Sequence, residues 1–265
     1  MSEHVRAAAV AGLFYPGKRG ELLSSVEALL ADHAAGSHAP KAVIVPHAGY
    51  VYSGETAARA FARIAPVADQ IERVVILGPS HRVPFHGVAA HTADAFLTPL
   101  GSVTVDRAAV DDLLSLPQVV TLNIAHEHEH SLEVELPFLQ RLLGSFRVVP
   151  LVVGDASSEE VANVLDRVWG GPETLIVIST DLSHYLDYDR ARQRDRRTAD
   201  HILALNADAI GHGDACGCNP LRGMLALARR RRMRIEMLGL CNSGDTAGTR
   251  DRVVGYGAFA LHERP

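Results

Sequence analysis

Four short apolar segments of this sequence each run into a histidine or a cysteine, the side chains that most often bind transition metals. The pairs are 42–45 with His47, 73–77 with His81, 174–179 with His184, and 234–240 with Cys241. Two neutral imidazoles and one thiolate suit a borderline or soft metal, such as iron(II), zinc or copper(I). Three protein ligands would leave positions open for water, oxygen or substrate.

These apolar segments are typical of buried parallel strands. They are rich in β-branched residues and end abruptly in small polar residues. Because the carboxyl ends of parallel strands meet at one edge of a sheet, we expect His47, His81, His184 and Cys241 to share one pocket. The alternative is that each imidazole only bonds backbone at its own strand end. The common position after a strand favours the shared pocket.

Two residues after the segment 174–179 have more than one expected role. His184 is a candidate fourth metal ligand, or a general base and proton shuttle near pH 7. Asp181 is expected either to orient an imidazole or bind metal, or to cap a short helix after the strand. The two interpretations of Asp181 have equal weight.

A histidine cluster alternates with glutamates at 126–130. Alternate residues share a face on a strand but not on a helix. We therefore expect a split, in which His130 and Glu133 lie near the pocket and His126 faces solvent. A metal-gathering loop is the other interpretation of this cluster.

Three further side chains are candidates with simpler alternatives. Tyr50 and Tyr52 flank a Gly-rich turn and are expected either to line a pocket wall or to pack that loop. Cys216 precedes a helix, where a thiol of lowered pKa is one interpretation. A small buried residue at a tight turn is the favoured interpretation of Cys216.

The remaining patterns predict alternating helices and strands along one domain of 1–265. Helices are predicted at 19–32, 55–64, 106–114, 132–143, 158–168, 189–205 and 220–232, and further strands at 87–90, 95–98, 102–105, 119–122, 147–153 and 253–262. Ser157 or Ser158 is expected to cap the helix at 158. This alternation predicts a three-layer α/β/α sandwich with a mostly parallel central sheet.

Composition excludes several function classes. The formal net charge is -5 over 265 residues, which argues against a nucleic-acid partner. No uninterrupted run approaches the roughly 18 apolar residues that span a bilayer, so no membrane partner is expected. The chain has 3 cysteines, an odd and low count that fits a reducing cytoplasm. The G-x-G-x-x-G, P-loop and G-x-S-x-G patterns are absent.

With these stretches identified, the sequence resembles the Memo family. The matching segments are Phe14-Tyr-Pro16, Pro46-His-Ala-Gly-Tyr-Val-Tyr-Ser-Gly54, Gly78-Pro-Ser-His81, Thr98-Pro-Leu-Gly101, Glu129-His-Ser-Leu-Glu-Val-Glu-Leu-Pro-Phe138, Ser179-Thr-Asp-Leu-Ser-His-Tyr185 and Cys241-Asn-Ser-Gly-Asp245. They cover nearly the whole chain in order, and as a set they are highly specific.

The resemblance implies a fold like that of the class III extradiol (LigB-like) non-haem iron dioxygenases. It implies His47, His81 and Cys241 as metal ligands, and Asp181 and His184 as catalytic residues. It also puts Tyr50, Tyr52, Ser80, His130, Glu133 and Asp245 around the pocket. The third ligand of the dioxygenases is a carboxylate, whereas a cysteine stands here, and a thiolate shifts metal preference and redox behaviour.

The resemblance also suggests partners and two classes of function. Bacterial and archaeal Memo proteins include the B protein of the AmmeMemoRadiSam system, which implies radical-SAM and AMMECR1-type partners. The first hypothesis is a redox protein that uses iron(II), or else copper or zinc, on an unknown substrate. The alternative is a non-catalytic module that binds a peptide or small molecule or handles metal. A zinc hydrolase is a weaker third interpretation.

Overall fold

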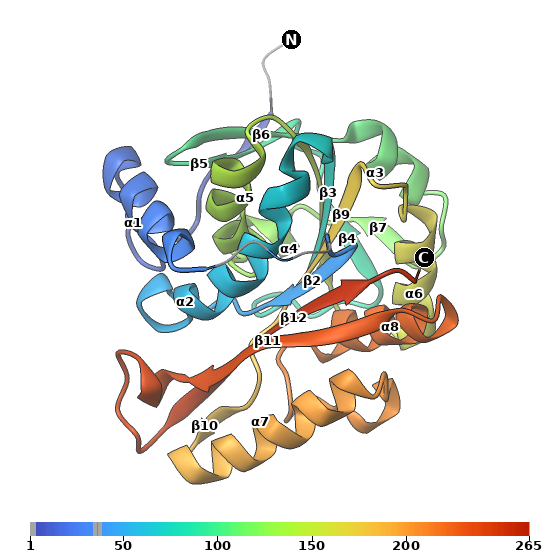
Figure 1. Cartoon of the computed structure of the whole chain (residues 1–265). Coiled ribbons are helices and arrows are strands. Elements are labelled where there is room, and N and C mark those ends of the chain that lie inside the picture. Colours follow the sequence, from blue (N-terminus) through green and yellow to red (C-terminus); the bar gives the residue numbers. More distant parts are fainter. Residues whose placement is uncertain (1–3, 34–35, 37–38, 265) are drawn as a thin grey trace.

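A computed structural model describes residues 4–33, 36 and 39–264. Its strands are β1 (Val5–Arg6), β2 (Ala42–Val45), β3 (Arg73–Pro79), β4 (Val88–Ala90), β5 (Ala95–Thr98), β6 (Gly101–Val105), β7 (Val119–Thr121), β8 (Arg147–Val153), β9 (Thr174–Ser179), β10 (His184–Leu186), β11 (Arg234–Asn242) and β12 (Val253–His262). They join in one mixed sheet, which crosses the molecule in Figure 1.

Helices separate most of these strands. The α-helices are α1 (Arg19–Ala31), α2 (Tyr50–Phe61), α3 (Arg107–Leu113), α4 (Ile124–Glu127), α5 (Leu136–Leu143), α6 (Ser158–Arg167), α7 (Tyr188–Leu203) and α8 (Cys218–Arg230). Short 3-10 helices are η1 (Ala62–Gln70), η2 (Glu133–Glu135), η3 (Ala207–Ala209) and η4 (Ser243–Asp245). The Ser157 hydroxyl accepts the Glu160 backbone N–H at the start of α6, so Ser157 is the cap.

The centre of the sheet is parallel. Strands β6, β8, β3, β9 and β2 lie in that order, and each pairs in parallel with its neighbour. β2 and β9 are buried along their whole length, as expected for strands covered on both faces. Antiparallel strands lie on either side of this centre, where β5 pairs with β6 and β12 with β2.

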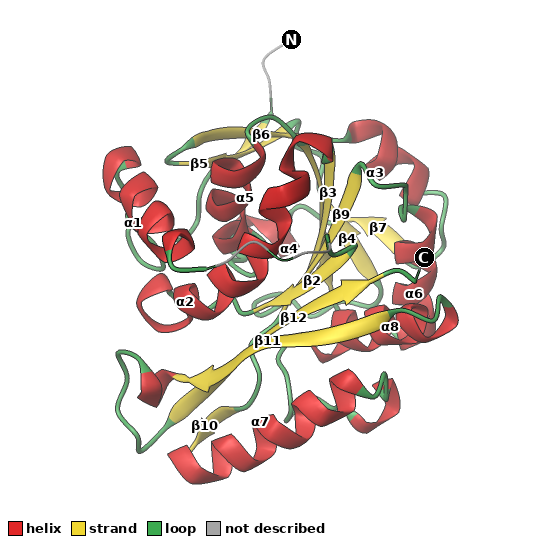
Figure 2. Ribbon diagram, in the orientation of Figure 1, coloured by secondary structure: helices red, strands yellow, loops and turns green. Residues whose placement is uncertain are grey.

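Helices cover both faces of the sheet. Helices α1, α2 and α5 contact one another in one layer, and α6 packs on α8 in the other. Figure 2 shows these two groups of red helices on either side of the yellow strands. Helix α7 packs over β11 and β12. The predicted three-layer α/β/α sandwich is therefore confirmed.

The predicted neighbours β2, β9 and β3 are adjacent and parallel. Their carboxyl ends therefore bring His47, Asp181 and His81 to one edge of the sheet. The fourth strand behaves differently, because β11 runs on through Cys241 to Asn242 and pairs with β12. Cys241 lies inside a strand, opposite Tyr256, rather than beyond its end. No helix in the described part of the chain is long and apolar enough to cross a membrane.

Candidate metal centre

His47, His81 and Cys216 form a compact group of ligand atoms. One nitrogen from each histidine and the Cys216 sulfur all lie within 4.8 Å of one another. The Cys216 Sγ is 3.3 Å from His47 Nε2. Tetrahedral ligands at the usual metal–sulfur and metal–nitrogen distances lie about 3.5 Å apart. The spacing of this pair therefore fits two ligands of one metal ion.

His47 is fixed in one tautomer by Ser179. Its Nδ1 lies 2.7 Å from the Ser179 hydroxyl oxygen. That hydroxyl has one hydrogen, and the Ser131 carbonyl at 2.6 Å and the Glu135 carboxyl at 3.0 Å are its acceptors. His47 Nδ1 must therefore donate to Ser179, which leaves the Nε2 lone pair facing Cys216. Burial, and then the neighbouring His81, His130 and His184, hold the pKa of His47 well below 6.5, so the imidazole is neutral.

His81 is oriented by the buried carboxylate of Glu129. Glu129 accepts the His81 backbone N–H at 2.7 Å and contacts its Nδ1 at 2.9 Å. Although burial alone would raise it, hydrogen bonds and charge from His81 lower the pKa of Glu129 to about 2. A carboxylate on one nitrogen of a ligating histidine fixes the ring and raises the basicity of the other nitrogen. His81 therefore presents Nε2 to the site.

Cys216 enters the site from the turn before α8. Its sulfur accepts the Asp181 backbone N–H at 3.3 Å, and the Cys216 N–H donates to the Asp181 carbonyl at 3.3 Å. Burial, followed by the charge of Asp181, raises the pKa of this thiol. The interpretation of Cys216 as a thiol of lowered pKa is therefore wrong for the protein without metal. A bound cation would reverse this, because a coordinating thiol is deprotonated outright.

Cys241 does not join this group, contrary to the convergence predicted from its place in the sequence. Its Sγ lies 3.0 Å from the Thr56 hydroxyl of α2. The reason is local, because β11 continues to Asn242 and the sequence predicted that this strand ends at 240. Cys241 therefore lies within the strand, where successive side chains point to opposite faces of the sheet. The geometry thus makes Cys216 the candidate third metal ligand beside His47 and His81, whereas the resemblance implies Cys241 as that ligand.

Asp181 and His184 lie beside the group. The Asp181 carboxylate accepts the His47 backbone N–H at 2.8 Å, and no helix follows it, so it is not a helix cap. Burial raises the pKa of Asp181 to about 7, against the opposing effects of the His47 N–H and the His81 charge. His184 Nδ1 lies 2.8 Å from the Leu182 carbonyl, and burial lowers the pKa of His184.

The histidine cluster divides as predicted for His130 but not for His126. The His130 ring stacks on His81 with centroids 4.6 Å apart and lies 5.3 Å from the His47 ring. His126 is only 1% exposed and its Nε2 lies 2.9 Å from the Ala89 carbonyl, so its predicted solvent exposure is wrong. Glu133 is bound by Arg6 and by the Tyr15 hydroxyl. A second possible group, of His81, Glu129 and His130, overlaps the first.

The other predicted pocket residues scatter around this edge. Tyr50 is buried and donates to the Val134 carbonyl at 2.8 Å, which is the packing role. Tyr52 is partly exposed on α2. The Ser80 hydroxyl donates to the Val83 carbonyl at 2.6 Å, and Asp245 accepts the Asn242 backbone N–H at 3.0 Å.

Sequence reasoning missed Glu129, Ser179 and Glu135 as supports of the site. Glu129 lies in the alternating histidine cluster, and such a charged, polar stretch gave no indication that its side chain is buried. Ser179 was placed at the end of its strand, and alternation along β9 gives no sign that its hydroxyl reaches His47. Burial raises the pKa of Glu135 well above its usual range, and only the packed structure reveals that burial.

Comparisons with known proteins identify the family of this chain. A family model described as "Memo-like protein" matches residues 6–260. The chain belongs to the Memo family. A Memo-family protein of Aquifex aeolicus is 35% identical over 263 residues, covering 95% of this chain and 97% of the relative. One of Methanopyrus kandleri is 35% identical over 285 residues, covering 97% and 98%.

A solved structure supports the fold of this Memo-family chain. The crystal structure of the uncharacterized protein JW3007 of Escherichia coli K12 superposes with a TM-score of 0.53 at 11% identity. The match covers 83% of this chain and 99% of that protein. At such low identity it shows a shared fold alone.

Proposed function

We propose that this Memo-family protein binds one metal ion through His47, His81 and Cys216 and uses it in redox chemistry on a small-molecule or peptide substrate. The observation that carries the proposal is the meeting of three ligand atoms within 4.8 Å at the carboxyl edge of the sheet. Each histidine has its Nδ1 engaged by Ser179 or Glu129. This second layer of contacts is what metal-ligating histidines require.

The donor set guides the choice of metal. Imidazole suits iron, copper and zinc alike, whereas a thiolate favours softer ions such as copper(I) or zinc. We take iron(II) as the first candidate, from the dioxygenase-like fold, with copper and zinc as alternatives. When bound, a redox-active ion would supply electron transfer and Lewis acidity at this edge of the sheet.

We propose that the remaining residues of the site transfer protons and form the walls of the pocket. Asp181 holds the loop of His47 through the backbone N–H. We assign proton transfer to Asp181 and His184, from their position beside the ligands. His130 forms a wall by stacking on His81, which restricts the approach of substrate to the other side of that ring.

We also propose partner proteins and a cellular compartment for this protein. The resemblance to the AmmeMemoRadiSam protein supports an association with radical-SAM and AMMECR1-type proteins. Three free cysteines in the structure suit a reducing compartment, for which we propose the cytoplasm.

Metal analysis tests the proposal directly. Wild-type protein purified without oxygen should carry about one iron or copper ion per chain, or take one up when supplied. His47→Ala, His81→Ala and Cys216→Ser should each lose it, whereas His128→Ala, at an exposed histidine of the same cluster, should not. Circular dichroism of each variant separates loss of metal from loss of fold.

Cys241→Ser is the matched control for the thiol. Retention of metal in Cys241→Ser and its loss in Cys216→Ser would support the geometry. The reverse would overturn our assignment of Cys216 and establish the ligand that the resemblance implies. Folded protein that takes up neither iron(II) nor copper(I) would refute the metal proposal and favour the binding module. Metal-loaded protein that cannot be reduced and reoxidised would refute the redox role and favour metal handling.

A further inference from the structure

His81 stands between two groups of metal-binding side chains. Besides its place with His47 and Cys216, it forms a second group with Glu129 and His130, whose ligand atoms also all lie within 4.8 Å of one another. His81 Nδ1 lies 2.9 Å and His130 Nδ1 lies 3.4 Å from Glu129 Oε1. Nitrogen and oxygen ligands of one tetrahedral ion lie roughly 3.4 Å apart. The spacing around Glu129 therefore fits ligands of a cation.

The Glu129 carboxylate is a buried negative charge without a lysine or arginine partner. Its side chain is 1% exposed, and its ionic partners in the described part of the chain are the rings of His81 and His130. Arg6 lies close by but donates to the Glu129 backbone carbonyl. Buried charges in proteins are as a rule paired or bound to metal ions. A cation beside Glu129 would compensate its charge.

One lone pair of this carboxylate faces the second group. A carboxylate has about four lone-pair positions. Three of them accept backbone N–H groups, of His81 at 2.7 Å and of His130 and Ser131 at 2.9 Å each. The contact with His81 Nδ1 uses the fourth. A cation can bind there in place of the proton that Glu129 and His81 share.

The position of His130 goes beyond what the orientation of His81 requires. A carboxylate alone is enough to orient a ligating histidine. His130 nevertheless stacks on the His81 ring with centroids 4.6 Å apart, and the Phe14 ring contacts its own ring at 4.6 Å. The 3.4 Å from His130 Nδ1 to Glu129 exceeds the length of an ordinary N–H···O hydrogen bond. Packing therefore holds this nitrogen beside the carboxylate, at the spacing of a shared ion.

Solvent reaches the second group. The side chains of His81 and His130 are 29% and 15% exposed, whereas that of Glu129 is buried beneath them. A hydrated cation can therefore approach the two rings from outside and bind the carboxylate below.

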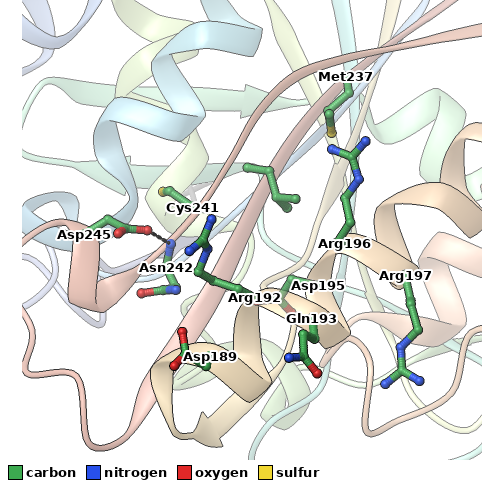
Figure 3. A pocket seen from close by; sticks show the side chains of 11 residues that line it. Asp189, Arg192, Gln193, Asp195, Arg196, Arg197, Met237, Cys241, Asn242 and Asp245 are labelled. Carbon is green, nitrogen blue, oxygen red and sulfur yellow. Dashed lines mark hydrogen bonds between the residues drawn. The ribbon is translucent and has the colours of Figure 1, made fainter.

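The groove between α7 and β11 is the other place where a cysteine and carboxylates meet, and it suits a cation less well. Cys241, Asp189 and Asp245 are among the side chains that line it (Figure 3). No histidine lines this groove among the described residues, and Arg192 lies beside the two carboxylates. A second cation is therefore favoured at His81.

We propose that this edge of the sheet binds a second divalent cation, of the class of zinc(II) or iron(II), through His81, Glu129 and His130. With both ions bound, His81 would hold the inner ion by Nε2 and the outer ion by Nδ1, as a bridging imidazolate. The Nδ1 proton would leave to solvent, and the outer ion would take its place beside Glu129. The inference rests on the proposed function, because His81 belongs to both groups.

The outer ion should be the more weakly bound of the two. Its group offers a carboxylate instead of a thiolate, and two of its three side chains are partly exposed. We therefore expect the outer ion to appear on titration with added metal, rather than in the purified protein.

Cobalt(II) titration of the full-length, metal-free protein without oxygen tests the proposal. Cobalt bound to the Cys216 thiolate gives a charge-transfer absorption that the outer ion lacks. We expect about two ions per chain, the first with this absorption and the second without it. Two ions that share one ring are magnetically coupled, so the EPR signal of the first should weaken when the second binds.

Three variants separate the two positions. His130→Ala should keep the thiolate-bound ion and weaken the outer ion by at least about ten-fold, since even changes around a ligand cost about 10–100-fold in affinity. Cys216→Ser should lose the charge-transfer absorption and keep the outer ion. His128→Ala, at an exposed histidine two residues before His130, should bind both ions as the wild type does. Circular dichroism checks the fold of each variant.

The outcomes distinguish this inference from the proposed function. A single thiolate-bound ion, in the wild type and in His130→Ala alike, would overturn the second position and leave the proposed function intact. Two ions that persist in His130→Ala, or that show no magnetic coupling, would place the second ion away from His81 and also overturn it. A single ion without thiolate absorption, lost in His130→Ala, would support the outer group and refute Cys216 as a ligand. Folded protein that binds no cobalt would overturn both.

Discussion

The two histidines of the candidate metal centre are held by chemically different partners. His81 has a buried carboxylate on Nδ1 at 2.9 Å, whereas His47 has a serine hydroxyl at 2.7 Å. A carboxylate partner raises the basicity of the ring more than a hydroxyl does. His81 is therefore the stronger donor, and His47, which is 1% exposed, is the more rigid. Only His47 is buried, so desolvation keeps that ring neutral.

His126 gives a stability prediction that depends on pH. Burial lowers the pKa of His126 from 6.5 to about 3. Between these two values the unfolded chain binds a proton that the folded chain excludes, so stability is present above pH 6.5 and lost as the pH falls. The linkage amounts to about 2 kcal/mol between pH 7 and pH 5. In His126→Gln, the free energy of unfolding should therefore fall by about 2 kcal/mol less than in the wild type between pH 7 and pH 5. Urea unfolding at both pH values measures this difference.

The control for this effect lies two residues away. His128 is exposed, and His128→Gln should unfold with the same pH dependence as the wild type. If His126→Gln keeps the full loss of stability between pH 7 and pH 5, then His126 is not the group that resists protonation.

At the scale of elements, the sequence predicted the sheet better than the site. The bounds of β2, β5, β9 and β12 match the predicted strands, because buried β-branched runs are strong local signals. Helix α2 begins at Tyr50 instead of 55. The Gly-rich turn ends earlier than composition indicates, since Gly49 serves as the residue before the first helical turn.

The site could be predicted only where a ligand follows a strand directly. His47 and His81 follow β2 and β3, and parallel pairing through β9 brings them together. Cys216 comes from a turn over Asp181, a contact between residues 35 positions apart that no local pattern encodes. Cys241 was expected just beyond the end of its strand, whereas β11 continues to Asn242, because strand ends are uncertain by a few residues. Its role as a metal ligand stays a prediction from the resemblance.

Close packing of α7 on β12 depends on Gly255. A Cβ atom at this position would lie 2.0 Å from Asp195 Oδ2 of the helix. Gly255→Ala should therefore force α7 away from the sheet and lower the free energy of unfolding by about 1–3 kcal/mol. Chemical denaturation of both proteins measures the change.

The comparison for this substitution is Gly20→Ala in α1, where an added Cβ meets no atom within 4 Å. That change should be neutral or stabilise the protein by up to about 1 kcal/mol, because alanine favours the helix. Equal destabilisation by both changes would mean that the contact with Asp195 is not the cause.

At the scale of the whole molecule, one buried arginine links the amino-terminal segment to the metal centre. Arg6 lies in β1, which pairs with β5 near the margin of the sheet. Its guanidinium donates to the His126 carbonyl at 2.8 Å and the Glu129 carbonyl at 2.6 Å, and it pairs with the Glu133 carboxylate. Since Glu129 orients His81, the position of a proposed metal ligand depends on a strand from the start of the chain.

Arg6→Leu should therefore affect both the fold and the site. Removing one member of a buried ion pair leaves the other uncompensated and costs about 3–5 kcal/mol. Glu129 should lose its fixed position, so the variant, assayed where it is still folded, should bind metal more weakly than the wild type. Arg141→Leu is the control, because it removes an exposed ion pair with Glu27. It should lower the free energy of unfolding by only about 0–1 kcal/mol and leave metal binding unchanged. Metal affinity that survives in folded Arg6→Leu would show that the segment from 126 to 133 holds its shape without Arg6. In that case the amino-terminal strand stabilises the molecule without acting on its metal centre.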